Sequence, residues 1–264
     1  MPRGEDDEYE ILGSTQNPSE TQHLVAHVLG LPSNRIVCRV KRLGGGFGGK
    51  ETRSAFVACG LAVAARKFQR PVRCILSREE DMAMSGQRHP FLGKYKVGFT
   101  DIGKLISLEL ELFSNAGYSM DLSLAVMERA LSHSDNCYFI PNLKATGKLC
   151  KTNTPTNTAF RGFGGPQGMM VAEHWIRHVA EKVGKPVEEI QRLNLYTPNQ
   201  RTHYRQPLEE VHIDRCWEEC VKTSDFVARK QLVEIFNKKN KWRKRGIAVV
   251  PTKYVVIAKH CRKY

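Results

Sequence analysis

Residues 43–51 form the part of the chain whose composition most directly suggests chemistry. Five of the six positions from 44 to 49 are glycine, and Phe47 stands among them. Glycine loses much conformational entropy on folding and buries no side chain, so such a run is useful where the backbone turns sharply or touches a ligand. A glycine-rich turn without a ligand is the alternative, although turns rarely need so many glycines. The run therefore predicts a backbone cradle, with Phe47 carried on strained and exposed backbone.

Two nucleotide-binding patterns match this loop in part. Gly44, Gly46 and Gly49 satisfy G-x-G-x-x-G, but basic and amide side chains stand where a dinucleotide site needs an acidic residue about 20 positions later. The run also fits a P-loop up to Lys50, after which Glu51 replaces the required Ser or Thr. A carboxylate there would repel a phosphate. A cradle for a different cofactor remains the third interpretation.

A second glycine cluster, at residues 159–167, repeats the composition of the first. Glycines again flank a phenylalanine, Phe163, with Arg161 and Gln167 nearby. The cluster precedes a predicted helix, whose free N–H groups favour an anion. Two such loops suggest one site built from two sides, and two unrelated tight turns are the alternative.

The elements that must position these loops differ in kind along the chain. Hydrophobic periodicity and stop signals predict helices and strands. The expected helices cover 20–30, 52–66, 166–183 and 187–196, and the expected strands cover 35–42, 72–76, 95–99 and 106–112, the last two joined in a hairpin through 100–103. The mixture predicts an α+β fold of mixed sheets with packed helices, not a regular doubly wound sheet.

Composition limits the functional classes. The 264 residues carry a net charge of +14, with a basic run at 238–245 around Trp242. Such a run can bind nucleic acid, but it is more often a solvated helix end, so we expect no nucleic-acid partner. The chain has no apolar run of about 18 residues and no secretory signal at its start, so we expect no membrane partner. Its eight cysteines lack a C-x-x-C pair, and Cys216 and Cys220 alone give a weak metal signal, which favours reduced thiols.

Several longer motifs together resemble one family. They lie at residues 14–17, 44–51, 86–91, 127–131, 135–138, 160–167 and 241–246. In this order they are similar to the molybdenum-cofactor domain of the xanthine dehydrogenase family, and the likeness runs from about residue 9 to residue 254. The resemblance implies the first half of a molybdopterin-binding hydroxylase domain of aldehyde oxidase/xanthine dehydrogenase type over 1–254, followed by a divergent tail over 255–264.

The resemblance implies a cofactor role for four residues. Gln16 would bind an oxygen ligand of molybdenum through a hydrogen bond. Phe47 and Arg161 would offer backbone contacts around the metal, and Gly48 would belong to the same cofactor-binding loop. The implied cofactor is molybdenum–molybdopterin, and this chain would supply part of its site.

The resemblance also implies a purine substrate. The family hydroxylates hypoxanthine to xanthine and xanthine to urate, with water as the oxygen source, in purine catabolism. Glu51 would bind the purine ring, Arg129 would face a purine carbonyl, and Phe163 would pack against the heterocycle. A carboxylate and a guanidinium together favour a purine over the substrates of aldehyde oxidases. We expect Phe47, Glu51, Arg129 and Phe163 to line one pocket.

The resemblance covers only part of the family's machinery. It places FAD, NAD and 2Fe-2S sites, and the general-base glutamate, in regions that this sequence does not contain, so no catalytic base is assigned here. We therefore expect a fragment that does not turn over alone, related to a homodimeric cytoplasmic or peroxisomal enzyme. The alternatives are a non-catalytic basic interaction module, an aldehyde oxidase-type fragment and an unstable remnant.

Overall fold

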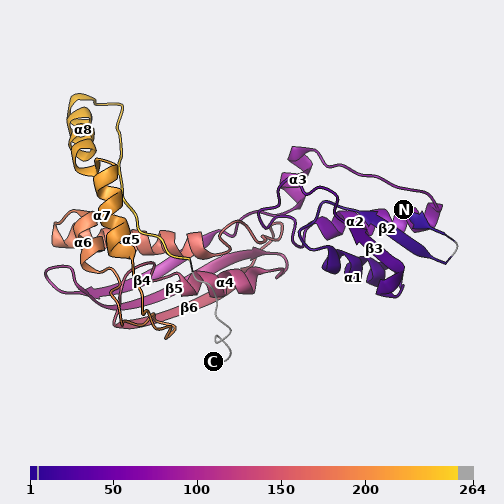
Figure 1. The fold of residues 1–264 in the computed structure, drawn as a ribbon, viewed down its shortest axis with the longest axis horizontal. Helices are drawn as coiled ribbons and strands as arrows, with labels where there is room; N and C mark the ends of the chain where they lie inside the picture. The colour runs from indigo at the N-terminus through magenta and orange to yellow at the C-terminus, as the bar shows by residue number, and fades with distance from the viewer. Residues whose placement is uncertain (5, 255–264) are drawn as a thin grey trace. The chain divides into compact units, whose positions relative to one another are not determined.

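The computed structural model describes residues 1–4 and 6–254, and the predicted tail over 255–264 lies outside them. The chain divides into two compact units, each built from three segments (Figure 1). Unit 1 contains residues 1–92, 113–128 and 148–164. Unit 2 contains residues 93–112, 129–147 and the described chain from 165 onward. Both units combine helices and strands, which confirms the α+β prediction.

Unit 1 contains a small mixed sheet of order β1-β2-β3. Strand β1 (Pro2–Arg3) pairs antiparallel with β2 (Glu8–Leu12). Strand β2 runs parallel to β3 (Ile36–Arg39), with Tyr9 opposite Ile36. Parallel neighbours need a crossover, and helix α1 (Pro18–Leu29) provides it. The helix begins at Asn17, whose side chain accepts a hydrogen bond from Glu20 N, and it ends at Gly30 in the left-handed region, close to the predicted bounds.

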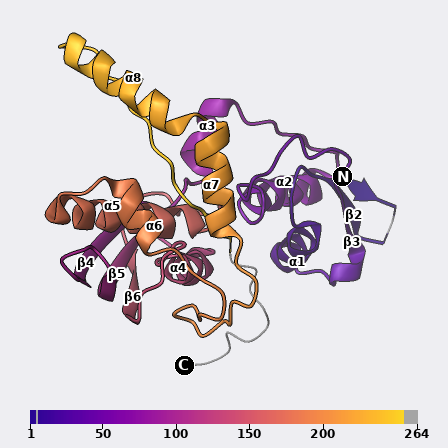
Figure 2. The same ribbon diagram turned by 60° about the vertical axis from the view of Figure 1, so that its left-hand side comes forward.

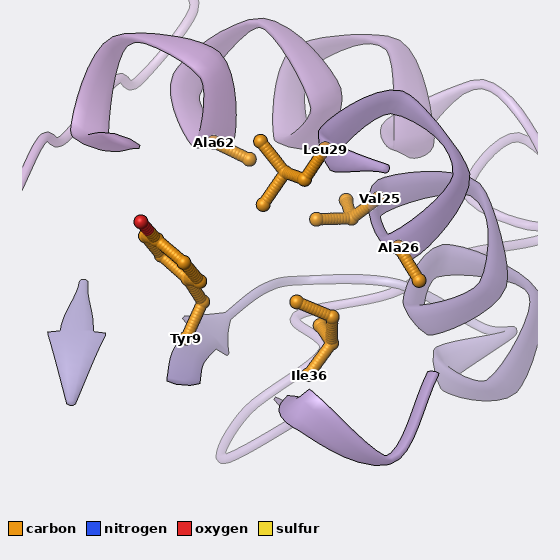
Figure 3. Packing of buried hydrophobic residues seen from close by; sticks show 6 residues of the cluster. All are labelled: Tyr9, Val25, Ala26, Leu29, Ile36 and Ala62. Atoms are coloured by element: carbon orange, nitrogen blue, oxygen red, sulfur yellow. The ribbon is translucent and has the colours of Figure 1, made fainter. Parts of the chain in front are cut away.

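The hydrophobic core of unit 1 lies between this sheet and two helices. Figure 3 shows Tyr9 and Ile36 facing Val25, Ala26 and Leu29 of α1, with Ala62 of α2 (Ser54–Phe68) beside them. Positions 25, 26 and 29 share one face of α1, as a helical period requires. The small side chains of α2 let this helix pack close to α1. This packing holds the ends of β2 and β3 and the start of α2, the three points from which the first glycine loop and its partners emerge.

Helix α3 (Arg78–Met84) follows α2 along the chain, and Ser77 and Glu80 form a capping box at its start.

A second sheet, of order β4-β5-β6, lies mostly within unit 2. Its strands are β4 (Phe91–Phe99), β5 (Leu105–Gly117) and β6 (Asn142–Lys151). The turn between β4 and β5 is closed by hydrogen bonds from Thr100 N to Lys104 O and from Gly103 N to Thr100 O. The predicted hairpin is therefore confirmed. Alternate leucines of β5 are buried, which gives the sheet one apolar face.

Helices cover that sheet along one side. In both ribbon views α5 and α6 lie along the same side of β4, β5 and β6 (Figures 1 and 2). Trp175, Ile176 and Val179 of α5 are completely or almost completely buried. The remaining helices are α4 (Ser123–Ser132), α5 (Gly165–Val183), α6 (Val187–Leu193), α7 (Ile213–Thr223) and α8 (Phe226–Lys239). None of the helices in the described chain is both long enough and apolar enough to cross a bilayer.

Two element predictions are wrong. Residues 72–76 form no strand. Their composition is typical of a strand, but they pair with no strand among the described residues, and Ile75 is 74% exposed. The helix expected to reach Tyr196 ends at Leu193, because Leu195 forms a β-bridge with Tyr138. In the first case the segment lacks a neighbouring strand, and in the second a distant strand partner ends the helix. Both outcomes depend on long-range pairing and not on local propensity.

Candidate functional site

The first glycine loop has left-handed backbone at four positions. Gly44, Gly45 and Gly48 have φ of 68°, 97° and 92°, and Phe47 has φ of 51°. A bulky L-residue in this region is an outlier that costs about 1–2 kcal/mol. Phe47 is also 61% exposed, so burial of its ring does not offset the strain. Strain held in place by its surroundings is a sign of function.

Gln16 ties this loop to the end of β2. Its Oε1 accepts hydrogen bonds from Gly48 N at 2.8 Å and Lys50 N at 3.3 Å, and its own N donates to Lys50 O at 2.8 Å. Two N–H donors aimed at one side-chain atom require that atom to be the amide oxygen. A β-carbon on Gly46 would lie closer than 3.0 Å to this side chain. The Nε2 group consequently remains as a donor with no partner among the described residues.

Lys50 closes the base of the loop. Its Nζ donates to Ser14 Oγ and to Leu43 O, both at 2.8 Å, and Ser14 Oγ donates to the same carbonyl. A P-loop lysine instead directs its ammonium to phosphate oxygens. Lys50 therefore has a structural role, and the P-loop interpretation is wrong on geometry as well as on sequence.

The two glycine loops touch each other within unit 1. A β-carbon on Gly48 would lie 2.8 Å from Ala159 O and 3.1 Å from Phe160 N. Neither atom can move aside as a flexible side chain would, so only glycine permits this approach. Arg88 supports the second loop by donating to Arg161 O at 2.7 Å and lying 5.3 Å from the Phe160 ring centroid.

The second loop shares the left-handed Phe–Gly pair of the first. Gly162, Phe163 and Gly164 have φ of 93°, 49° and 94°. Phe163 is half-buried, and its N donates to Phe160 O at 2.7 Å. Each loop thus holds a phenylalanine in the left-handed region between glycines. Two strained phenylalanines on touching loops are hard to explain as unrelated turns.

The loops leave a set of neutral donors available. Neither Phe47 N nor Arg161 N donates to another residue in the described chain, and Gln16 Nε2 is likewise available. Gly48 N already donates to Gln16 Oε1, and its α-carbon lies against the second loop. The cofactor-binding roles of all four residues stay predictions.

Glu51 ends the first loop with a half-buried carboxylate. Its N donates to Gly48 O at 3.2 Å. No hydrogen bond or ion pair joins this carboxylate to another residue of the described chain. It is therefore not an ordinary surface ion pair, and it is available to a ligand donor.

Arg129 belongs to unit 2, whereas Gln16, Phe47, Gly48, Glu51, Arg161 and Phe163 belong to unit 1. Its guanidinium lies 5.1 Å from the ring centroid of Tyr254, a cation–π distance. His133, which is fully buried, donates from Nδ1 to Arg129 O at 2.8 Å. Burial lowers the pKa of His133, so it stays neutral beside this arginine. The common pocket predicted for Arg129 and the loop residues stays a prediction.

A buried ion pair that the sequence did not reveal holds the segment carrying Tyr254. The carboxylate of Asp135 is fully buried and lies 2.5 Å from Lys253 Nζ, while Tyr196 Oη donates to it at 2.7 Å. Burial alone would raise the pKa of Asp135, but Lys253 and His203 outweigh it and lower that pKa. Lys253 and Asp135 are 118 positions apart, so no local motif could indicate the pair.

A large cavity adjoins the first loop within unit 1. Its volume is about 1130 Å³, and its lining includes Phe47, Lys50, Arg53, Phe160 and residues of the segment 74–86, which contains helix α3. Arg53 is buried, and its Nε donates to Ser85 O at 3.2 Å. The cavity has mainly apolar walls with a few polar groups, which is typical of ligand sites. Space for a sizeable organic ligand therefore lies directly beside the strained Phe47.

The basic run at 238–245 caps the end of α8. Lys244 Nζ donates to Asn237 O at 2.6 Å, and the guanidinium of Arg245 lies 3.9 Å from the Phe236 ring centroid. Trp242 is 86% exposed. Part of the positive charge is thus engaged in closing a helix end, in agreement with a solvated, structural role.

Comparison with known proteins identifies relatives along almost the whole chain. The chain is 57% identical to xanthine dehydrogenase/oxidase of Gallus gallus and 55% identical to that of Felis catus, each over 254 residues. The alignments cover 96% of this chain and 19% of each relative, so the chain spans about a fifth of their length. The resemblance that the motifs predict is confirmed.

A solved structure and a family model agree with this result. Aldehyde oxidoreductase from Desulfovibrio gigas matches with a TM-score of 0.78 at 25% identity, over 91% of this chain and 26% of that one. The model described as "Molybdopterin cofactor-binding domain" matches residues 1–195. Since this match includes both glycine loops, Gln16 and Arg129, the chain belongs to the molybdopterin cofactor-binding domain family.

Proposed function

We propose that the two touching glycine loops of unit 1 bind a molybdenum–molybdopterin cofactor. The observation that carries the proposal is the pair of phenylalanines, Phe47 and Phe163, held in left-handed backbone on loops that meet at Gly48. Phe47 N and Arg161 N donate to no other residue of the described chain, so both N–H groups are available to a ligand. Family membership indicates which ligand such a cradle would take.

The donors present suit this group. Oxygen atoms bound to molybdenum carry negative charge and accept hydrogen bonds, and the loops offer Phe47 N, Arg161 N and Gln16 Nε2 as donors. The described residues include no cluster of three or more His, Cys, Asp or Glu arranged for a metal. A metal carried by an organic ligand needs no such cluster, because the protein contacts only the outer atoms. When bound, the cofactor supplies oxygen transfer and accepts electrons.

We further propose that a protein that contains this chain and has the full length of its relatives acts on a purine. Glu51 would accept or share a proton with a ring nitrogen, because its half-buried carboxylate has no partner in the described chain. Phe163 would pack on the heterocycle, a contact worth about 0.5–1.5 kcal/mol beyond the buried area. For Arg129 the proposal rests on its motif and on Tyr254, which restrains its guanidinium. A fixed cation stabilises negative charge that develops on a ring carbonyl, an effect of about 2.7–4 kcal/mol for one donor.

The cofactor proposal is tested by measuring molybdenum and pterin in the chain purified from a host that makes molybdopterin. We expect the wild-type chain to retain both, and Gln16→Ala to retain about tenfold less, the effect of losing one hydrogen bond to a charged group. Gln231→Ala, at an exposed position of α8, is the matched control and should behave as wild type. Wild-type chain that folds but retains no molybdenum would overturn the proposal.

The purine proposal has a separate test on the cofactor-loaded chain. Xanthine should bind more tightly than benzaldehyde. The Glu51→Gln variant should have a lower affinity for xanthine and an unchanged affinity for benzaldehyde. Equal loss for both ligands, or preference for the aldehyde, would favour an aldehyde oxidase-type substrate and contradict the purine assignment.

A further inference from the structure

Two histidines and a tyrosine form a cluster on unit 2 that the proposed cofactor site does not use. His174 and His178 lie four residues apart on α5, and Tyr95 lies on β4. The two imidazole centroids are 4.6 Å apart, and Tyr95 Oη lies 2.6 Å from His178 Nδ1. Both histidines are exposed, whereas Tyr95 is half-buried. The rings are therefore close together and open to solvent.

The spacing places both imidazoles on one face of the helix. Residues four apart are neighbours on a helix surface, and two histidines at this spacing are a known way for a helix to bind a transition metal. One ion held by two imidazole nitrogens at about 2.0–2.1 Å from each brings those nitrogens to roughly 3–3.5 Å from each other. Rings whose centroids are 4.6 Å apart can reach this separation by small side-chain rotations.

Tyr95 orients one of the two ligands. A metal-bound histidine normally uses its other ring nitrogen in a hydrogen bond that fixes the ring. The contact at Nδ1 of His178 leaves Nε2 pointing away from the tyrosine. A phenol can both donate and accept, so this hydrogen bond survives when Nε2 binds a cation and the proton moves to Nδ1.

We propose that His174 and His178 bind one divalent transition-metal ion through their Nε2 atoms, with Tyr95 as the positioning residue for His178. The ion belongs to the class that prefers imidazole, such as Ni²⁺, Cu²⁺ or Zn²⁺. Water completes its coordination, because the described chain adds no third His, Cys, Asp or Glu in ligand geometry. This site is independent of the molybdenum cofactor.

The chain offers a matched comparison on α1. His23 and His27 have the same four-residue spacing and are also exposed. Neither of these two described residues makes a ring contact or has a tyrosine partner. Cys216 and Cys220 on α7 are a second exposed pair at this spacing, with thiols in place of imidazoles. These two pairs separate the effect of spacing from the effect of a preorganised cluster.

The test is a calorimetric titration of the tag-free full chain with NiCl₂. It compares wild type with the double variants H174A/H178A, H23A/H27A and C216S/C220S, and with Tyr95→Phe. We expect H174A/H178A to lose one equivalent of Ni²⁺ that the other double variants keep. Tyr95→Phe should weaken that equivalent about 10- to 100-fold. Far-UV circular dichroism checks that each exposed-site variant is folded.

Three results would contradict the proposal. H174A/H178A could bind as many equivalents as wild type, or H23A/H27A could lose the same equivalent. Either result would move the ion away from α5. Unchanged affinity in Tyr95→Phe would contradict the positioning role of the tyrosine, because a ring without its hydroxyl keeps the packing but not the hydrogen bond.

Discussion

Alanine substitutions in the first glycine loop separate backbone strain from steric contact. Gly44 has φ of 68°, and a β-carbon added at this position would have no atom within 4 Å. Gly48 has φ of 92°, and its β-carbon would lie 2.8 Å from Ala159 O. Gly49 has no left-handed φ, and its nearest neighbour, Gly46 O, is 3.5 Å away. The three positions therefore test strain alone, strain with a clash, and neither.

The structure sets the expected order of free-energy changes. Gly44→Ala should lower the stability of unit 1 by about 1–2 kcal/mol, the cost of left-handed backbone for an L-residue. Gly48→Ala adds an overpacking cost of about 1–3 kcal/mol, because backbone atoms of the second loop must move. Gly49→Ala should be neutral or stabilising by about 0.4–1 kcal/mol, since alanine restricts the unfolded chain.

Amide hydrogen exchange followed by mass spectrometry is the suitable assay. All three tryptophans, Trp175, Trp217 and Trp242, belong to unit 2, so intrinsic fluorescence would not report on unit 1. Peptides from α1 and α2 measure the opening free energy of unit 1 directly. If Gly48→Ala costs no more than Gly44→Ala, the two loops are not in contact and the structural basis of the proposed cradle is wrong.

Four further predictions concern the buried ion pair, the basic run and catalysis. Lys253→Met should destabilise unit 2 by about 3–5 kcal/mol, measured by tryptophan fluorescence in urea, because it strands a buried carboxylate. The pKa of Asp135 is lowered on folding, so its contribution is present above about pH 4 and is lost as pH falls through the folded value; Asp135→Asn should remove this dependence. Nucleic acid should show no binding that falls steeply with salt, since residues 238–245 cap α8, and such binding would favour a basic interaction module. The purified chain should not convert xanthine to urate, because no residue in its sequence is assigned as the general base; measured urate formation would contradict this.

Local patterns predicted the parts of the structure that local interactions determine. The helix over 20–30 has an Asn cap and a terminal glycine, and the hairpin through 100–103 has turn residues between alternating strands. The glycine loops were also visible, because only close approach or left-handed backbone explains so many glycines. Helix α3 was missed although Ser77 and Glu80 form a capping box that could have indicated it.

The remaining features depend on partners far away in the sequence. Residues 72–76 have strand-like composition but no neighbouring strand in the described chain, and composition cannot report a partner. The pairing of Asp135 with Lys253 is equally invisible. The motif identifies Gln16, but no local pattern indicates that Gly48 N and Lys50 N fix its amide orientation.

Hydrogen exchange at the two loops tests the cofactor proposal most directly. The full chain is compared with and without bound molybdenum–molybdopterin, and exchange is followed in peptides covering 44–51 and 159–165. We predict protection at the amides of Phe47 and Arg161 on cofactor binding, while Gly48, already bonded to Gln16, changes little. A loaded chain whose loops exchange as fast as those of the cofactor-free chain would show that the cofactor binds elsewhere.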